Sequence, residues 1–175
     1  MTASRTMPQP APAASLAIER WSATSGNERA SRANLVLTGG GRSWRAHATG
    51  DGAIDALMRA VDDALSPALG AGVELVTYAV HATGPGHETA GEVTVSIRWR
   101  EAPADAPVYP GRAVHDNVLE ASVHAYLDAI NALLADNAID LAAGAPKAPT
   151  GGSHAEAASE ARAHAASRIQ ASFNP

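Results

Sequence analysis

The stretch GDGAIDALMRAVDDAL at residues 50–65 decides the fold, because it returns 65 positions later as HDNVLEASVHAYLDAI at residues 115–130. The first copy carries Ile54, Leu57, Met58, Val61 and Leu65 at the spacing of one helical face. When the two copies are aligned, identical residues face each other at five positions: Asp51 and Asp116, Ala56 and Ala121, Ala60 and Ala125, Asp63 and Asp128, and Ala64 and Ala129. The pattern predicts two amphipathic helices in a duplicated chain. Chance similarity between two alanine-rich helices is the alternative.

Three short runs with the composition of β-strands precede each helix. They lie at 16–21, 33–38 and 42–48 before the first helix, and at 73–82, 92–100 and 108–114 before the second. Pro67 and Gly70 are expected to stop the first helix, and the second is expected to end near Asn137. The prediction is therefore an α+β fold made of duplicated β-β-β-α units, with antiparallel sheets and two helices packed on one face.

The two ends of the chain differ in composition from its middle. Residues 1–14 are rich in Pro, Ala, Ser and Thr, which predicts a disordered arm. Residues 15–140 hold the duplicated pattern and are expected to form the folded domain. Residues 141–175 begin with linker composition and continue as an alanine-rich segment with few apolar anchors, which predicts a linker and a weakly helical tail.

Composition narrows the classes of function. The formal net charge is -5 and no basic run offsets it, which argues against nucleic-acid and anionic-membrane partners and favours small neutral or zwitterionic ones. The chain has no cysteine, which excludes disulfides, thiolate nucleophiles and cysteine-based zinc sites. It shows neither a secretory signal nor a run long enough to span a membrane, so a cytoplasmic location is expected.

Motifs that carry chemistry are missing. The seven histidines have no paired metal-ligand spacing, and no nucleophile or phosphate-loop motif is present, so we expect no catalytic residue, no metal and no cofactor. The Gly50-Asp51-Gly52 turn is different, because backbone N–H groups at the start of a helix can bind a carboxylate. Plain helix capping is the alternative there, and on local sequence alone it is the stronger interpretation.

Four motifs in order resemble a known family. They are Gly50–Ala56 at the first helix start, Tyr78-Ala79-Val80-His81-Ala82 in a strand, Gly86–Gly91 at a turn, and Gly111–Ser122 at the second helix start. Over about residues 16–137 the chain resembles the C-terminal allosteric and dimerisation domain of 2-isopropylmalate synthase, which citramalate synthase shares. The resemblance implies a duplicated β-β-β-α fold that forms a homodimer and binds a feedback amino acid, leucine or isoleucine.

The same resemblance implies a set of ligand-binding residues around the helix starts. In this sequence they are Gly50, Gly52, Ile54, Leu75, Tyr78, Ala82, Thr89, Gly91, Val114 and Asp116. Main-chain groups would hold the ammonium and carboxylate groups of the amino acid, and Ile54, Leu75 and Val114 would shape its apolar slot.

The resemblance favours a stand-alone regulatory domain that binds a branched-chain amino acid, with leucine first, and acts in leucine biosynthesis. The catalytic barrel of the synthases lies outside this sequence, so we expect no enzyme activity. Two alternatives stay open. One is a dimeric interaction module that has lost its ligand, and the other is the regulatory chain of a split synthase that assembles with a separate catalytic chain.

Overall fold

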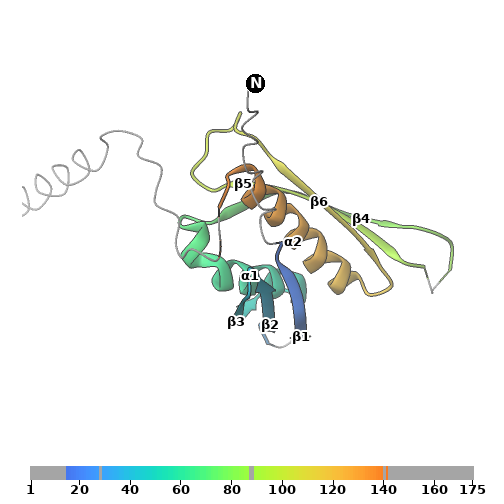
Figure 1. Cartoon of the computed structure of the whole chain (residues 1–175). Helices are drawn as coiled ribbons and strands as arrows, with labels where there is room; N and C mark the ends of the chain where they lie inside the picture. Colours follow the sequence, from blue (N-terminus) through green and yellow to red (C-terminus); the bar gives the residue numbers. More distant parts are fainter. Residues whose placement is uncertain (1–14, 28, 87–88, 140, 142–175) are drawn as a thin grey trace, which may run out of the picture.

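A β-β-β-α unit occurs twice in the structure, a computed structural model that describes residues 15–27, 29–86, 89–139 and 141 (Figure 1). The elements are β1 (Ala17–Thr24), β2 (Ser31–Gly39), β3 (Arg42–Gly50), α1 (Ala53–Leu69), β4 (Val73–Ala82), β5 (Gly91–Trp99), β6 (Tyr109–His115) and α2 (Val118–Asp136). They form two antiparallel three-stranded sheets, ordered β1-β2-β3 and β4-β5-β6. The predicted fold class and duplication are confirmed. The expected arm at 1–14 and the tail at 142–175 lie outside the described residues.

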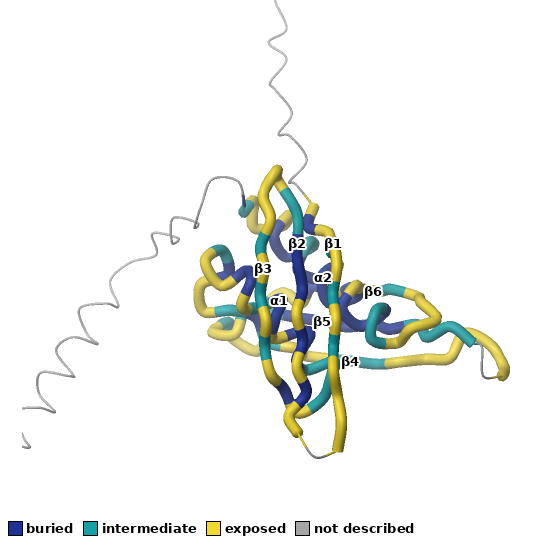
Figure 2. Tube along the Cα trace, turned by 90° about the horizontal axis from the view of Figure 1, so that it is seen from below, coloured by how far each residue is buried: buried dark blue, intermediate teal, exposed yellow. Residues whose placement is uncertain are grey.

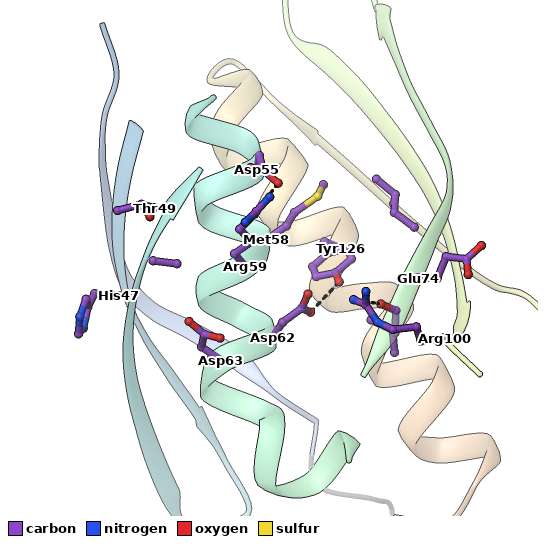
Figure 3. Close-up of a pocket in the computed structure, with 13 residues that line it drawn as sticks. His47, Thr49, Asp55, Met58, Arg59, Asp62, Asp63, Glu74, Arg100 and Tyr126 are labelled. Carbon is purple, nitrogen blue, oxygen red and sulfur yellow. Dashed lines mark hydrogen bonds and ion pairs between the residues drawn. The ribbon is translucent and has the colours of Figure 1, made fainter. Parts of the chain in front are cut away.

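Each sheet carries one helix on its inner face. Helix α1 packs on β2 and β3, α2 packs on β5 and β6, and the two helices contact each other. The strands show period-two burial: Ala33, Leu35 and Leu37 of β2 face α1 and are buried, while Arg32 and Asn34 face outward and are exposed. The inner faces and both helices form one core (Figure 2). Both helices start at the same end of the molecule (Figure 3).

Helix α1 continues through Pro67 to Leu69, with Gly70 as its C-cap, so the expectation that Pro67 helps to stop the helix is wrong. A proline lacks the N–H that would bond the carbonyl group of Asp63, four residues earlier. The hydroxyl of Ser66 donates to that carbonyl oxygen over 3.0 Å, which satisfies the acceptor that Pro67 leaves free. Gly70, at φ 55°, then ends the helix in a conformation that favours glycine.

Helix α2 lies very close to β6 at Gly111. A Cβ atom at Gly111 would collide with the carbonyl oxygen of Ala125 and the backbone nitrogen of Ala129. Only glycine permits this approach, which packs β6 directly against the middle of α2. Asn117 caps that start, with its side chain accepting a hydrogen bond from the N–H of Leu119 over 3.0 Å. The second helix therefore begins at a residue type that is common at helix N-caps.

The described chain reaches beyond α2. Leu141 is 6% exposed and belongs to the core, and its carbonyl oxygen accepts a hydrogen bond from the guanidinium group of Arg42 over 3.1 Å. The first residue of the segment expected to be a linker is thus packed against the domain.

Candidate ligand site at the helix starts

The ten candidate residues lie around the start of α1, the start of α2 and along β4. Gly50 ends β3, Gly52 is the N-cap of α1, and Ile54 lies in its first turn. The others are Leu75, Tyr78 and Ala82 on β4, Thr89 in the loop before β5, Gly91 at the start of β5, Val114 on β6, and Asp116 between β6 and α2. Because both helices start at the same end, the chain reversals that carry most of these residues face one side of the molecule (Figure 1).

The two glycines at the start of α1 differ in their surroundings. A Cβ atom at Gly50 would lie 2.5 Å from Asp55 Oδ2 and 2.6 Å from the backbone nitrogen of Ala56, so packing requires glycine there. A Cβ atom at Gly52 would meet nothing within 4 Å. The N-cap at Gly52 has an extended backbone and no side-chain cap, while Asp55 accepts a hydrogen bond from the N–H of Asp51 over 3.0 Å. Gly52 therefore leaves open space beside the N–H groups of the helix start.

At the start of α2, a chain of hydroxyl groups fixes Tyr78. The hydroxyl of Ser122 donates to the carbonyl oxygen of Val118 over 2.6 Å, and the oxygens of Tyr78 and Ser122 lie 2.7 Å apart. A serine hydroxyl has one proton, so Tyr78 must donate to Ser122. Gly91 adjoins the same turn, since a Cβ atom there would lie 3.7 Å from Val118. The phenolic oxygen of Tyr78 keeps its lone pairs for a donor such as an ammonium group.

Leu75 belongs to a different hollow, a cleft of about 900 Å³ between α1, β3 and β4. Figure 3 shows the polar side chains that line it: Asp55, Arg59, Asp62 and Asp63 from α1, His47 and Thr49 from β3, Glu74 from β4, with Arg100 and Tyr126. No other candidate residue lines this cleft. The structure therefore groups the candidates at the two helix starts and beside one cleft, and it does not enclose them in a single cavity.

The floor of the cleft holds a pair that sequence reasoning missed. The hydroxyl of Tyr126 donates to Asp62 Oδ1 over 2.7 Å. Burial raises the pKa of Asp62 to about 6, although the bond from Tyr126 and the charge of Arg100 act the other way. Burial, together with the neighbouring Asp62, raises the pKa of Tyr126 above its usual value. The available signal was a tyrosine on the apolar face of a helix, whose hydroxyl group needs a partner.

Two kinds of feature are missing from the described part of the chain, namely a cluster of metal-ligating side chains and a membrane-spanning helix. Its His, Asp and Glu side chains form no group of three or more that could hold a metal ion. None of its helices is long and apolar enough to cross a membrane.

Comparison with known proteins gives a consistent result. The model of the LeuA allosteric (dimerisation) domain matches residues 3–134. The chain is 35% identical over 114 residues to a 2-isopropylmalate synthase of Ruminiclostridium cellulolyticum, which is 65% of this chain and 21% of that protein. It is 32% identical over 127 residues to the synthase of Heliobacterium modesticaldum, 73% of this chain and 22% of that one. For the synthase of Salinibacter ruber the identity is 38% over 95 residues, 54% of this chain and 16% of that one.

The chain thus spans about a fifth of the length of such relatives. Its duplicated β-β-β-α fold, its two exposed helix starts and the family match over residues 3–134 agree. The chain belongs to the family of the LeuA allosteric (dimerisation) domain.

Proposed function

We propose that this protein is a non-catalytic regulatory domain that binds a branched-chain amino acid, with leucine first, and acts on 2-isopropylmalate synthase type enzymes in the cytoplasm. The observation that carries the proposal is the open space at Gly52, beside unpaired N–H groups of α1, in a chain of this family. A carboxylate fits such a helix start, because the N–H groups and the helix dipole both favour negative charge.

The second helix start supplies the complementary chemistry. The hydroxyl chain through Ser122 leaves the oxygen of Tyr78 as an acceptor, which suits the ammonium group of an amino acid. Ile54, partly buried in the first turn of α1, offers apolar surface for an aliphatic side chain. This division of roles among the candidate residues is part of the proposal.

A homodimer belongs to the same proposal. Most of the exposed large apolar side chains lie on β4 and at the ends of β6 and α2: Leu75, Val76, Val80, Val114 and Val118. Helix α2 covers β5 and β6 and leaves β4 at the edge of its sheet. A second copy that packs on β4 would cover this apolar surface and the edge, both of which are otherwise exposed to water.

Isothermal titration calorimetry of the purified chain with leucine, isoleucine and valine tests the proposal. We expect saturable binding of at least one of them, with leucine the tightest, and no binding of 4-methylpentanoate, which lacks the ammonium group. If none of the three amino acids binds to the folded dimer, the interaction-module alternative replaces the regulatory function. If binding occurs only with an added synthase barrel, the split-synthase alternative is the correct one.

A further inference from the structure

The outer face of the β1-β2-β3 sheet carries three arginines. Helix α1 covers the inner face, and in Figure 2 the three strands cross in front of both helices. The register places Arg20 and Arg45 on either side of Val36, and Arg32 lies farther along β2 on the same face. The outward rows are Ala17–Thr38–Ser43, Arg20–Val36–Arg45, Ser22–Asn34–His47 and Thr24–Arg32–Thr49. We call this surface the arginine face.

Val36 shows how two of the arginines lie. It points outward and no helix covers it, yet it is only 5% exposed. Arg20 and Arg45 flank it on the neighbouring strands, so their aliphatic stems supply the cover. Both arginines are exposed and line a hollow at the middle of the face. The hollow, of about 400 Å³, runs between them and is also lined by the polar side chains of Ser22, Asn34 and His47.

The paired outward rows of the arginine face hold no acidic side chain, and the exposed Glu19 lies beside Arg20 in the β-bulge of β1, outside those rows. Within the described ranges, none of its three arginines forms an ion pair. The second β-β-β-α unit of the same chain can be compared with the first. On the outer face of the β4-β5-β6 sheet, Arg98 pairs with Glu74 at 2.8 Å and Arg112 pairs with Glu92 at 2.6 Å. One unit neutralises its outer arginines and the other does not, although the whole chain has a net charge of -5.

Unpaired arginines on the same face of a sheet repel each other. Arg20 and Arg45 are two strands apart, about 10 Å, which is close to the distance over which physiological salt screens charge. A carboxylate between them would relieve the repulsion and could be held by both guanidinium groups and by the amide of Asn34. We propose that the arginine face docks an acidic surface of another protein, with a carboxylate seated in the hollow over Val36. This inference is independent of amino-acid binding at the helix starts.

A protein partner fits this face better than a nucleic acid. A nucleic-acid binder uses a long basic stripe on a basic domain to neutralise many phosphates. Here three arginines lie on one short sheet of an acidic chain. The hollow also has an apolar floor and a polar rim, which is the anatomy of a small protein interface.

Nuclear magnetic resonance titration of the whole chain with a short poly-glutamate peptide at low salt tests the proposal. We expect the amide signals of Arg20, Asn34 and Arg45 to shift, and the shifts to disappear as salt is added. Arg45→Ser should weaken binding about fivefold, while Arg45→Lys, which keeps the charge, should retain most of it. Arg112→Ser is the matched control, because Arg112 also lies on the outer face of a third strand but is paired. It should change the affinity less than about twofold.

Three results would overturn the proposal: no shifts at low salt, shifts spread equally over β4–β6, or equal losses in Arg45→Ser and Arg112→Ser. A thymidine oligonucleotide of the same charge is the remaining arm. If it saturates the arginine face at lower concentration than the peptide, the partner is a nucleic acid and the protein-docking proposal fails. Thermal melts of each variant, followed by circular dichroism, verify that a lost signal is not lost folding.

Discussion

The hydroxyl of Tyr126 on α2 donates a 2.7 Å hydrogen bond to the carboxylate of Asp62 on α1, and so joins the two β-β-β-α units beneath the cleft. Asp63 and Arg59 lie beside Asp62 on the same helix, and Arg100 reaches it from the end of β5. Burial is the largest influence and raises the pKa of Asp62 to about 6. The junction between the units therefore contains a carboxyl group that holds its proton more tightly when the protein is folded.

Stability should fall as Asp62 ionises. Its pKa is 3.8 when unfolded and about 6 when folded, so between these values the folded state binds more protons. The contribution of Asp62 to stability is complete below about pH 4 and is lost as the pH rises to about 6. The loss is at most about 3 kcal/mol. Asp62→Asn, which cannot ionise, should gain stability relative to the parent between pH 4 and 7, as measured by urea unfolding.

The difference in unfolding free energy between the parent and Asp62→Asn reports on Asp62 alone, because all other groups titrate in both proteins. Tyr126→Phe is the companion variant. It removes the hydrogen bond that lowers the pKa of Asp62. Replacing Asp62 by Asn in the Tyr126→Phe background should therefore change the pH dependence of the unfolding free energy more than the same replacement in the parent. A constant difference between parent and Asp62→Asn across this pH range would mean that Asp62 titrates normally.

Asn131 ties the first strand to the last helix. Its side-chain oxygen accepts from the N–H of Leu16 at 2.8 Å, and its nitrogen donates to the carbonyl oxygen of Leu16 at 3.0 Å. Leu16 is 3% exposed, so Asn131→Ala leaves both backbone groups without a partner. We expect a loss of about 2–3 kcal/mol in the free energy of unfolding, with an unchanged denaturant slope. Asn34→Ala, which removes an exposed 3.5 Å contact with Ser22, should change stability by less than about 0.5 kcal/mol.

These hydrogen bonds between distant parts of the chain could not be predicted from the sequence. Periodicity located both helices and all six strands, and the repeat located the units, because burial of one face leaves a regular pattern. The role of Pro67 was missed, since the compensating bond from Ser66 depends on the geometry of one helical turn. Asp62 with Tyr126, and Leu16 with Asn131, are separated by 64 and 115 positions and have no local signature. The candidate site residues were predicted from sequence motifs. The residues that surround them in space can be identified only in the folded structure.

The apolar edge at β4 should hold the homodimer together. Val80 is 43% exposed on β4, and a charged side chain there would have to be buried between two copies. Val80→Lys should therefore shift sedimentation at micromolar concentration from dimer to monomer. Val108→Lys is the control, since Val108 is 49% exposed but precedes β6 on a loop. If both variants stay dimeric, the copies meet elsewhere, and if the parent itself is a monomer, the proposed homodimer is wrong.

The thermal stability of a C-terminally truncated chain should depend on whether the chain keeps Leu141. A chain ending at residue 145 keeps Leu141 and its bond to Arg42 and should melt cooperatively near the parent's midpoint. A chain ending at residue 138 loses the buried Leu141, which should cost about 1.5–3 kcal/mol. Differential scanning calorimetry measures both. Loss of cooperative melting in the longer product would place part of the tail in the core.

Substitutions at Gly50 and Gly52 should distinguish an effect on folding from an effect on ligand binding. Gly50→Ala places a Cβ atom 2.6 Å from the backbone nitrogen of Ala56, so the helix start must move and stability should fall by about 1–3 kcal/mol. Gly52→Val meets open space, and its extended backbone accepts a β-branched residue, so the cost is the weaker N-cap, about 1 kcal/mol. A ligand carboxylate at the N–H groups of α1 would nevertheless meet the valine side chain. Leucine affinity by calorimetry should therefore fall at least about tenfold, or about 1.4 kcal/mol.

Gly26→Val is the matched control for Gly52→Val, because a Cβ atom at Gly26 also meets nothing within 4 Å and the residue lies in the turn between β1 and β2. Its leucine affinity should equal that of the parent. A folded Gly52→Val protein with unchanged affinity would remove the carboxylate from the start of α1, even if leucine binds. Equal losses in both valine variants would point to a general effect on the fold, because Gly26 lies on a different chain reversal from the helix starts. Only a loss confined to Gly52→Val places the ligand where the open space is.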